Sequence, residues 1–138
     1  MSDILHASCV AFGHNGVLIT GKSGSGKSSL ALELIALGGV LVADDRTIIT
    51  AQNDRLTATC PAPISGQIEV RKIGILATET QPSATIRLVV DLDQSEPDRL
   101  PPHRKITISG IELDCIFGKD TLNLAIATKL YLIGGRVA

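Results

Sequence analysis

Aromatic residues are scarce in this chain: no tryptophan, one tyrosine and two phenylalanines among 138 residues. Proteins that bind single-stranded nucleic acid stack the bases on aromatic rings, so the composition argues against that kind of binding. Net charge is also small, −1 from 13 Lys and Arg against 14 Asp and Glu. Nucleic acids and anionic membranes attract basic patches, so we expect neither as a partner.

Long apolar runs are missing as well. No run approaches the ~18 residues of a transmembrane helix, and the N-terminus lacks the basic start and apolar core of a signal peptide. The three cysteines, Cys9, Cys60 and Cys115, are widely spaced in apolar stretches, which predicts buried, reduced thiols rather than disulfides or a zinc site. We therefore expect a cytoplasmic protein with one domain over residues 1–138.

Residues 21–28 read Gly-Lys-Ser-Gly-Ser-Gly-Lys-Ser and match the phosphate-binding loop pattern. Glycines let successive backbone amides point at a di- or triphosphate. The pattern predicts that Lys27 reaches the β- and γ-phosphates and that Ser28 binds Mg²⁺. A flexible surface loop is the alternative, but a strand pattern precedes the segment and a helix pattern follows it. The expected phosphate-binding residues are Gly21, Lys22, Ser23, Gly24, Ser25, Gly26, Lys27 and Ser28.

The rest of the chain consists mainly of short strand patterns. We expect strands over residues 5–12, 17–20, 40–43, 46–50, 55–59, 66–70, 73–77, 85–92, 106–109 and 111–116, and helices over 28–37 and 121–133. Asn15-Gly16 predicts a hairpin turn, which would bring His6 close to the phosphate loop, and Asp120 is a candidate N-cap. Hairpins around a single loop–helix unit predict an α/β fold with a mixed, largely antiparallel sheet and two main helices.

Acidic residues at strand ends are the main candidates for chemistry. Asp44-Asp45 ends the apolar strand after the first helix, where a carboxylate can hold Mg²⁺ or accept a proton. Neighbouring side chains of a strand point to opposite sides, so one carboxylate can face the phosphate while the other anchors the loop; a plain turn is the alternative. Asp91 follows a similar apolar run, and there we favour the turn.

Other charged residues have a surface position as their default interpretation. Glu69, a lone carboxylate among apolar residues, is either a strand residue facing solvent or a metal ligand. Five cations outside the loop are candidates for steadying phosphate oxygens, with solvated surface as the default: Arg71, Lys72, Arg99, Arg104 and Lys105. For His6 and His103 the default is an ordinary, partly exposed histidine.

Taken together, these motifs resemble the catalytic domain of HPr kinase/phosphorylase, the bacterial enzyme that phosphorylates and dephosphorylates a serine of the phosphocarrier protein HPr. Residues 68–75 look like the family signature Leu-Glu-(Ile/Val)-Arg-Gly-Leu-Gly-Ile. The resemblance covers most of residues 5–76 and weakens beyond residue 80. Its other segments are 6–8, 16–21, 23–28, 31–35 and 41–45.

The resemblance implies a phosphate-loop kinase domain of the HPr kinase and PEP-carboxykinase-like type, with ATP and Mg²⁺ as cofactors. It assigns Asp45 as the base that takes the serine proton, His6 as a catalytic residue beside it, and Arg99 as a catalytic arginine. Lys27 matches the phosphate clamp, and Ser28 and Glu69 match the Mg²⁺ ligands. An HPr-type protein is the implied substrate, and a homo-oligomer, usually a hexamer, is the implied assembly.

Several positions depart from the family pattern. Lys72 stands where the signature has glycine, residues 99–105 form a short segment, and the last helix ends early. Family members usually carry an N-terminal domain, and we expect this sequence to start at the catalytic domain. Phosphorylase activity is therefore a weaker expectation than nucleotide binding. Two other functions remain open at this point: a small-molecule kinase or nucleotidase, and a nucleotide-sensing module without phosphoryl transfer.

Overall fold

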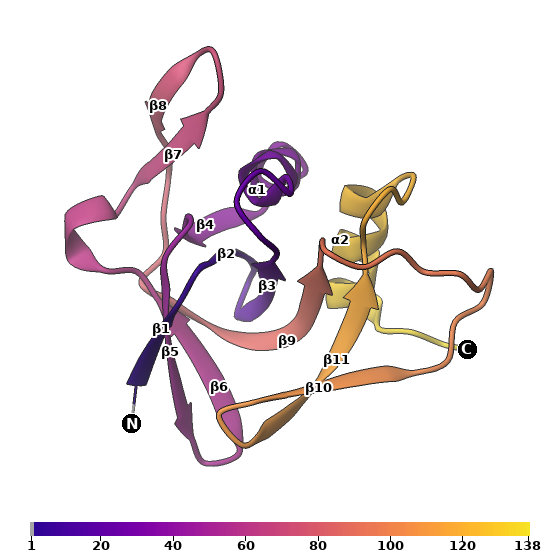
Figure 1. Cartoon of the computed structure of the whole chain (residues 1–138). Helices are drawn as coiled ribbons and strands as arrows, with labels where there is room; N and C mark the ends of the chain where they lie inside the picture. The colour runs from indigo at the N-terminus through magenta and orange to yellow at the C-terminus, as the bar shows by residue number, and fades with distance from the viewer. Residues whose placement is uncertain (1) are drawn as a thin grey trace.

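The computed structural model describes residues 2–138 and contains a large curled sheet, a small hairpin and two α-helices (Figure 1). The elements in chain order are β1 (Ser2–Leu5), β2 (Ala7–Phe12), β3 (Asn15–Thr20), α1 (Lys27–Ala36), β4 (Val40–Ala43), β5 (Thr47–Gln52), β6 (Arg55–Thr59), the 3₁₀ turn η1 (Ala62–Ile64), β7 (Gln67–Val70), β8 (Gly74–Ala77), β9 (Ser83–Asp91), β10 (Arg104–Ile108), β11 (Ile111–Phe117) and α2 (Leu124–Gly134).

The sheet is mixed and mostly antiparallel, as predicted. Its main path runs β1-β5-β6-β9-β3-β2-β4, and β11 joins β9 with β10 beside it. Among the named strands of residues 2–138, the parallel pairs are β3–β9 and β9–β11. The long strand β9 pairs with β6 through residues 83–85 and with β11 through residues 88–91. The sheet therefore divides along β9 into two arms, and the curl follows from this division.

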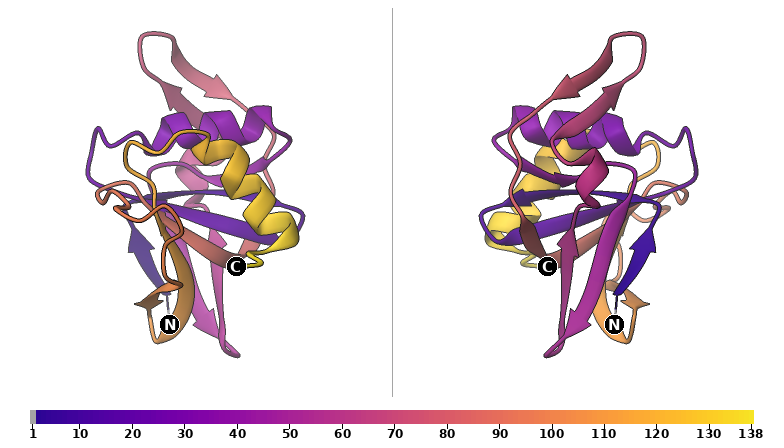
Figure 2. Two further views of the ribbon diagram at one scale, coloured as in Figure 1. Left: turned by 90° about the vertical axis from the view of Figure 1, so that its right-hand side faces the viewer. Right: turned by 90° about the vertical axis from the view of Figure 1, so that its left-hand side faces the viewer.

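Both helices pack on the same face of the central strands β2, β3 and β9 (Figure 2). Side chains of a strand alternate between faces, so Val17 and Ile19 of β3 face Leu34 of α1, whereas Leu18 faces the opposite way. The phosphate loop joins the end of β3 to the start of α1, so it lies at one edge of the helical layer.

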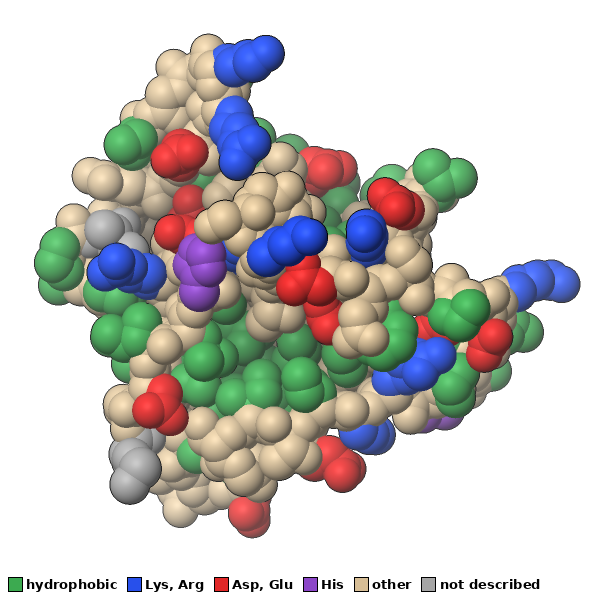
Figure 3. Space-filling view, viewed as in Figure 1, with side chains coloured by type: hydrophobic (Ala, Val, Ile, Leu, Met, Phe, Trp, Pro, Cys, Tyr) green, Lys and Arg blue, Asp and Glu red, His purple; other side chains and the backbone are tan. Residues whose placement is uncertain are grey.

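The other face of the sheet closes on itself rather than under a helix. Leu18 of β3 belongs to a second apolar cluster with Ile49 of β5, Leu56 of β6 and Leu113 of β11. Partly buried residues of β1 and β10 border this cluster, and Figure 3 shows apolar side chains gathered in the hollow between these arms. The curl of the sheet therefore supplies the second half of the core.

The first hairpin turns two residues earlier than predicted. Phe12 pairs with Asn15, so Gly13 and His14 form the turn, with Gly13 at φ 65°. Asn15 and Gly16 belong to β3 instead. A Cβ on Gly16 would lie 3.0 Å from Ala84 Cβ of β9, so this glycine permits the close approach of β9 rather than a turn.

Helix α2 starts at Leu124, later than the predicted residue 121. Asp120 and Asn123 have φ angles of 56° and 58°, and a helix cannot pass through such left-handed residues. Asn123 is therefore the N-cap and the prediction for Asp120 is wrong. Neither helix in the described part of the chain, residues 2–138, is long and apolar enough to cross a membrane.

Candidate functional site

The phosphate loop joins β3 to α1 and leaves the start of the helix open. Gly24 and Gly26 have φ angles of 84° and 102°, and Gly26 is an N-cap without a side-chain hydrogen bond. The first amides of a helix have no partner within the helix and carry the positive end of its dipole. The loop thus has the geometry that binds anions at helix N-termini.

Gly21 is required by the packing of this loop. A Cβ on Gly21 would lie 2.4 Å from Ser25 Oγ, and φ at this position is 150°. Ser25 Oγ is enclosed and makes no hydrogen bond with the described residues. A larger residue at position 21 would therefore displace the middle of the loop.

Lys27 folds back into the loop. Its side chain is buried, and Nζ donates hydrogen bonds to the carbonyl oxygens of Gly21 at 2.9 Å and Lys22 at 3.2 Å. These two carbonyl groups accept hydrogen bonds from the buried ammonium group, and its positive charge stays beside the loop amides. An incoming phosphate would meet a cation already in position.

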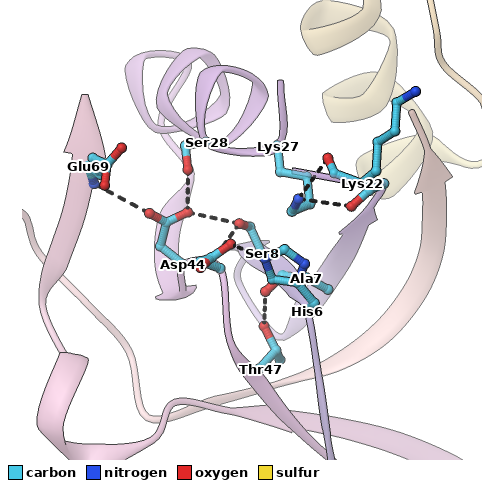
Figure 4. A network of polar contacts seen from close by, with 11 residues as sticks. His6, Ala7, Ser8, Lys22, Lys27, Ser28, Asp44, Thr47 and Glu69 are labelled. Atoms are coloured by element: carbon cyan, nitrogen blue, oxygen red, sulfur yellow. Dashed lines mark hydrogen bonds and ion pairs between the residues drawn. The ribbon is translucent and has the colours of Figure 1, made fainter. Parts of the chain in front are cut away.

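Asp44 is the centre of a polar network that the sequence analysis did not identify (Figure 4). Its buried carboxylate accepts hydrogen bonds from Ser8 Oγ at 2.8 Å and Ser28 Oγ at 2.9 Å. The backbone N–H of Glu69 donates to the second oxygen at 3.4 Å. One carboxylate therefore ties β2, α1 and β7 together at the end of β4.

Asp45 points to a different environment from its neighbour. Its backbone is left-handed, φ 65°, and its N–H donates to Ser8 Oγ at 3.0 Å. The side chain is largely exposed and lies 2.6 Å from His6 Nε2. Because the carboxylate is accessible and has an imidazole partner, it has the arrangement of a candidate base.

A cavity of about 380 Å³ brings most of these residues together. Its lining includes the predicted residues Ser23, Gly24, Gly26, Lys27, Ser28, Asp45 and Glu69, together with Asp44 and Arg71. Lys22 and Ser25 line a second cavity on the other side of the loop. Gly21, the first residue of the loop, is not among the residues that line either cavity, and its carbonyl oxygen accepts a hydrogen bond from Lys27 Nζ.

The position of Arg99 differs from the expectation. It is exposed in the segment between β9 and β10 and is not among the residues that line either cavity. Arg71, whose default interpretation was surface, lines the first cavity, and its Nη2 would lie 3.8 Å from a Cβ on Gly24. The β7–β8 hairpin, which stands off the sheet in Figure 1, brings Arg71 there.

The donors around Ser28 fit a magnesium ion. Ser28, Asp44 and Glu69, whose side chains carry oxygen atoms that can coordinate a metal ion, line one cavity. Mg²⁺ prefers oxygen ligands and is usually held by one or two carboxylates plus substrate phosphates. Within residues 2–138, no group of three or more His, Cys, Asp or Glu side chains forms a metal cage. A bound ion would therefore rely on phosphate oxygens for part of its coordination.

None of the three cysteines is among the residues that line the two cavities. All three are free, Cys9 buried and Cys60 and Cys115 half-buried. Burial raises the pKa of Cys9 to about 12 and of Cys115 to about 11. Burial, followed by the charge of Asp44, raises the pKa of Cys60. Thiols shifted in this direction are poor nucleophiles at neutral pH.

The sequence contained a signal for Asp44 but not for its partners. An acid at the end of the strand after a phosphate-loop helix commonly holds Mg²⁺, and either carboxylate of the pair qualified. Ser8 and Arg71 lie in segments that resemble the family, and Arg71 was a candidate phosphate-binding cation, but their contacts with Asp44 and with the cavity depend on strand pairing and on the hairpin. Sequence spacing alone does not reveal such contacts.

The curled mixed sheet, the glycine loop and the helix that follows it define the class of this protein as a phosphate-loop α/β domain. The model of the HPr Serine kinase C-terminal domain matches residues 1–116, and the chain belongs to this family.

Individual relatives agree. The chain is 45% identical over 107 residues to an HPr kinase/phosphorylase of Aromatoleum aromaticum, covering 65% of the chain and 33% of that protein. It is 41% identical over 102 residues to the HPr kinase/phosphorylase of Limosilactobacillus reuteri, covering 68% and 32%. The chain thus spans about a third of the length of these relatives.

A solved structure is similar throughout. The Hpr(Ser) kinase/phosphatase from Coxiella burnetii superposes with a TM-score of 0.77 at 28% identity. The match covers 92% of this chain and 91% of that one. The predicted fold class, an HPr kinase-type domain with a largely antiparallel sheet and two main helices, is confirmed.

Proposed function

We propose that this chain is the catalytic part of a Mg²⁺-dependent, ATP-using protein serine kinase that acts on an HPr-type phosphocarrier protein. One observation carries the proposal: Asp45, paired with His6 at 2.6 Å, lines the same cavity as Lys27 and Ser28. A proton acceptor and a phosphate site in one cavity are the two requirements of phosphoryl transfer to a hydroxyl. Family membership points to the same acceptor class.

The phosphate loop binds the phosphates of ATP. The amides at the start of α1 donate to the phosphate oxygens, and Lys27 exchanges its bonds with the carbonyls of Gly21 and Lys22 for bonds with phosphate. Arg71 adds a second cation from the hairpin. These contacts hold the triphosphate in one orientation, which is the main contribution of such sites to catalysis.

Magnesium would be held by Ser28 with Asp44 and Glu69, three residues that line the cavity. When bound, the ion neutralises charge on the phosphates. The hydrogen bond from Ser28 to Asp44 keeps the hydroxyl and the carboxylate together in its absence.

Transfer begins when a serine hydroxyl of the acceptor attacks the γ-phosphorus. The new serine O–P bond forms, the bond between γ-phosphorus and the bridging oxygen breaks, and ADP leaves. Asp45 accepts the serine proton while His6 orients its carboxylate. Arg99 remains a proposed catalytic residue, which reaches the cavity only if residues 92–103 rearrange.

The same groups support a reverse reaction. Inorganic phosphate attacks the phosphoserine phosphorus, the serine O–P bond breaks, and pyrophosphate and free serine result. Asp45 returns its proton to the serine oxygen.

Incubation with labelled ATP, Mg²⁺ and an HPr-type protein from the same organism tests the proposal. We expect label on one serine, and no label with Lys27→Ala. ATP turnover without labelled protein would favour a small-molecule kinase or nucleotidase. ATP binding without turnover would favour a nucleotide-sensing module.

We also propose that the chain forms a homo-oligomer, the hexamer being usual in the family. Exposed Ile126, Leu130 and Ile133 on α2 support self-association, since they form an apolar helix face. Sedimentation velocity tests this: a monomer at micromolar concentrations would contradict it.

A further inference from the structure

Ser8 is a buried polar residue to which the proposed mechanism gives no role. It lies in β2 and is fully enclosed, and its side chain faces the same side of the sheet as Val10, which belongs to the apolar cluster under the helices. β2 has β3, which leads into the phosphate loop, on one side and β4, which leads to Asp44 and Asp45, on the other. Ser8 therefore lies between the two halves of the candidate site.

The Ser8 hydroxyl makes two hydrogen bonds whose directions are fixed. Its Oγ donates to Asp44 Oδ1 at 2.8 Å and accepts the backbone N–H of Asp45 at 3.0 Å. An ionised carboxylate can only accept and a backbone N–H can only donate, so the hydroxyl proton is directed at Asp44 and a lone pair at Asp45. One hydroxyl thus orients the carboxylate of one aspartate and the backbone of the next.

The backbone of Asp45 has a conformation that needs such support. Its φ angle is 65°, which is rare for residues other than glycine and persists where the surrounding structure imposes it. Ser8 Oγ holds the N–H of Asp45, and the N–H of Arg46 donates to Asp44 O at 2.7 Å. These two bonds fix the peptide groups on both sides of Asp45, and with them the direction of its side chain.

We infer that Ser8 is a positioning residue, which holds the carboxylate of Asp45 beside His6 and in the phosphate-binding cavity. The inference rests on the proposed function, in which Asp45 accepts the serine proton. The carboxylate lies 2.6 Å from His6 Nε2, yet more than half of the Asp45 side chain is exposed. Exposed side chains change rotamer within nanoseconds, so a fixed backbone narrows the directions that this carboxylate can take.

A second buried hydroxyl nearby offers a matched comparison. Thr47 is also fully enclosed, and its Oγ1 donates to Ala7 O at 2.8 Å (Figure 4). This bond ties the start of β5 to the start of β2, the strand that carries Ser8. Thr47 thus holds the same part of β2 to the chain that follows Asp45, but its hydroxyl bonds to neither aspartate.

The test compares Ser8→Ala with Thr47→Val, each of which removes one of these hydroxyls with little change in volume. Both should lower the urea midpoint, since each loses a buried hydrogen bond. Phosphoryl transfer to an HPr-type protein is then measured per folded molecule at saturating ATP and Mg²⁺. We expect kcat to fall about 10–100-fold in Ser8→Ala, because a misplacement of about 1 Å can cost roughly 10²-fold. The KM for ATP should change by about twofold at most, and Thr47→Val should keep the wild-type kcat.

A double variant distinguishes positioning from a general structural role. If Ser8 acts through Asp45, adding Ser8→Ala to Asp45→Asn should slow transfer no further, since residues that act as a unit are not additive. Independent effects would multiply. A double variant slower than Asp45→Asn by the full factor that Ser8→Ala produces in the wild type would overturn the inference.

Crystal structures of the two single variants give a readout that needs no turnover. In Ser8→Ala we expect the contact between Asp45 and His6 to be lost, because the backbone of Asp45 is no longer held at its left-handed φ angle. In Thr47→Val the contact and the φ angle should both persist.

The outcomes separate this inference from the proposed function. Ser8→Ala with the wild-type kcat, or with the contact between Asp45 and His6 intact, would overturn the positioning role alone. A loss of rate that higher Mg²⁺ restores would also overturn it, because Ser8 would then act through Asp44 and the metal. Wild-type protein that transfers no phosphate to an HPr-type acceptor would overturn the proposed function and this inference together.

Discussion

His6 Nε2 lies 2.6 Å from Asp45 Oδ1, and this contact joins the residue between β1 and β2 to the second residue after β4. Both side chains are at least half exposed. Asp45 has a left-handed backbone, φ 65°, which turns its carboxylate toward His6 and the cavity instead of along the strand. Such a conformation is unusual for a residue other than glycine.

Asp45→Asn should stop transfer without preventing nucleotide binding. An amide cannot accept the serine proton, and a positioned base contributes about 10²–10⁴-fold to rate, so labelling of HPr should fall by that factor. Asp54→Asn is the matched control, since Asp54 is an exposed aspartate with φ 60° in the β5–β6 turn. Transfer at the wild-type rate in Asp45→Asn would remove Asp45 from its role.

Asp44→Asn should reduce both stability and magnesium response. The substitution replaces one acceptor oxygen with a donor among three donors, from Ser8, Ser28 and Glu69. A buried hydrogen-bonding group left unsatisfied costs about 1–3 kcal/mol, which urea unfolding measures. The Mg²⁺ concentration for half-maximal ATP binding should rise.

Asp3→Asn provides a control for that experiment, because Asp3 is exposed on β1. If Asp44→Asn leaves both the free energy of unfolding and the magnesium dependence of ATP binding unchanged, the network around Asp44 does not contribute to stability or to magnesium binding.

Lys72→Gly should stabilise the β7–β8 hairpin. Lys72 replaces the signature glycine and still has φ 67°, and a left-handed residue with a side chain costs about 1–2 kcal/mol. Part of that gain is offset by the extra backbone entropy of glycine, so we expect a net increase of about 0.5–1 kcal/mol in the free energy of unfolding. Lys72→Ala keeps the strain and should give no increase; equal effects of the two variants would contradict the explanation.

Asp114 should make stability depend on pH at the acid end. A hydrogen bond from Lys105, with a second from Tyr131, holds the pKa of the Asp114 carboxyl below its usual value. A folded pKa below the unfolded one stabilises the protein above the unfolded pKa, and this stabilisation disappears as pH falls through the folded pKa.

Asp114→Asn should therefore lower the urea midpoint at pH 7, and the difference from wild type should shrink as pH falls below about 4. Glu112→Gln on the same strand is the control, since Glu112 is exposed. A deficit of equal size at pH 7 and at the acid end would contradict an ionic origin.

Local features of this fold were predictable from sequence. The glycine loop, α1 and the hairpins depend on neighbouring residues, and the strand patterns lie close to the observed strands. The Gly13-His14 turn was not predictable, because Gly16 pairs with Ile86 of β9, far along the chain, and therefore belongs to β3.

The residues of the candidate site likewise include some that local sequence predicts and others that depend on long-range contacts. Lys27 and Ser28 follow from the loop pattern, whereas the polar network of Asp44 depends on the pairing of β2 with β4 and on the placement of β7. From the residue pattern alone, Arg71 and Arg99 were both candidate phosphate-binding cations with surface as the default, and the resemblance favoured Arg99. Only the three-dimensional path of the β7–β8 hairpin distinguishes them.

A crystal structure of the protein with Mg²⁺ and a non-hydrolysable ATP analogue tests the central claim most directly. We predict that Lys27 Nζ leaves the carbonyls of Gly21 and Lys22 for phosphate oxygens, with the γ-phosphate beside Ser28 and Asp45. A complex in which Lys27 keeps its bonds to those carbonyls, with the nucleotide bound elsewhere, would contradict the account.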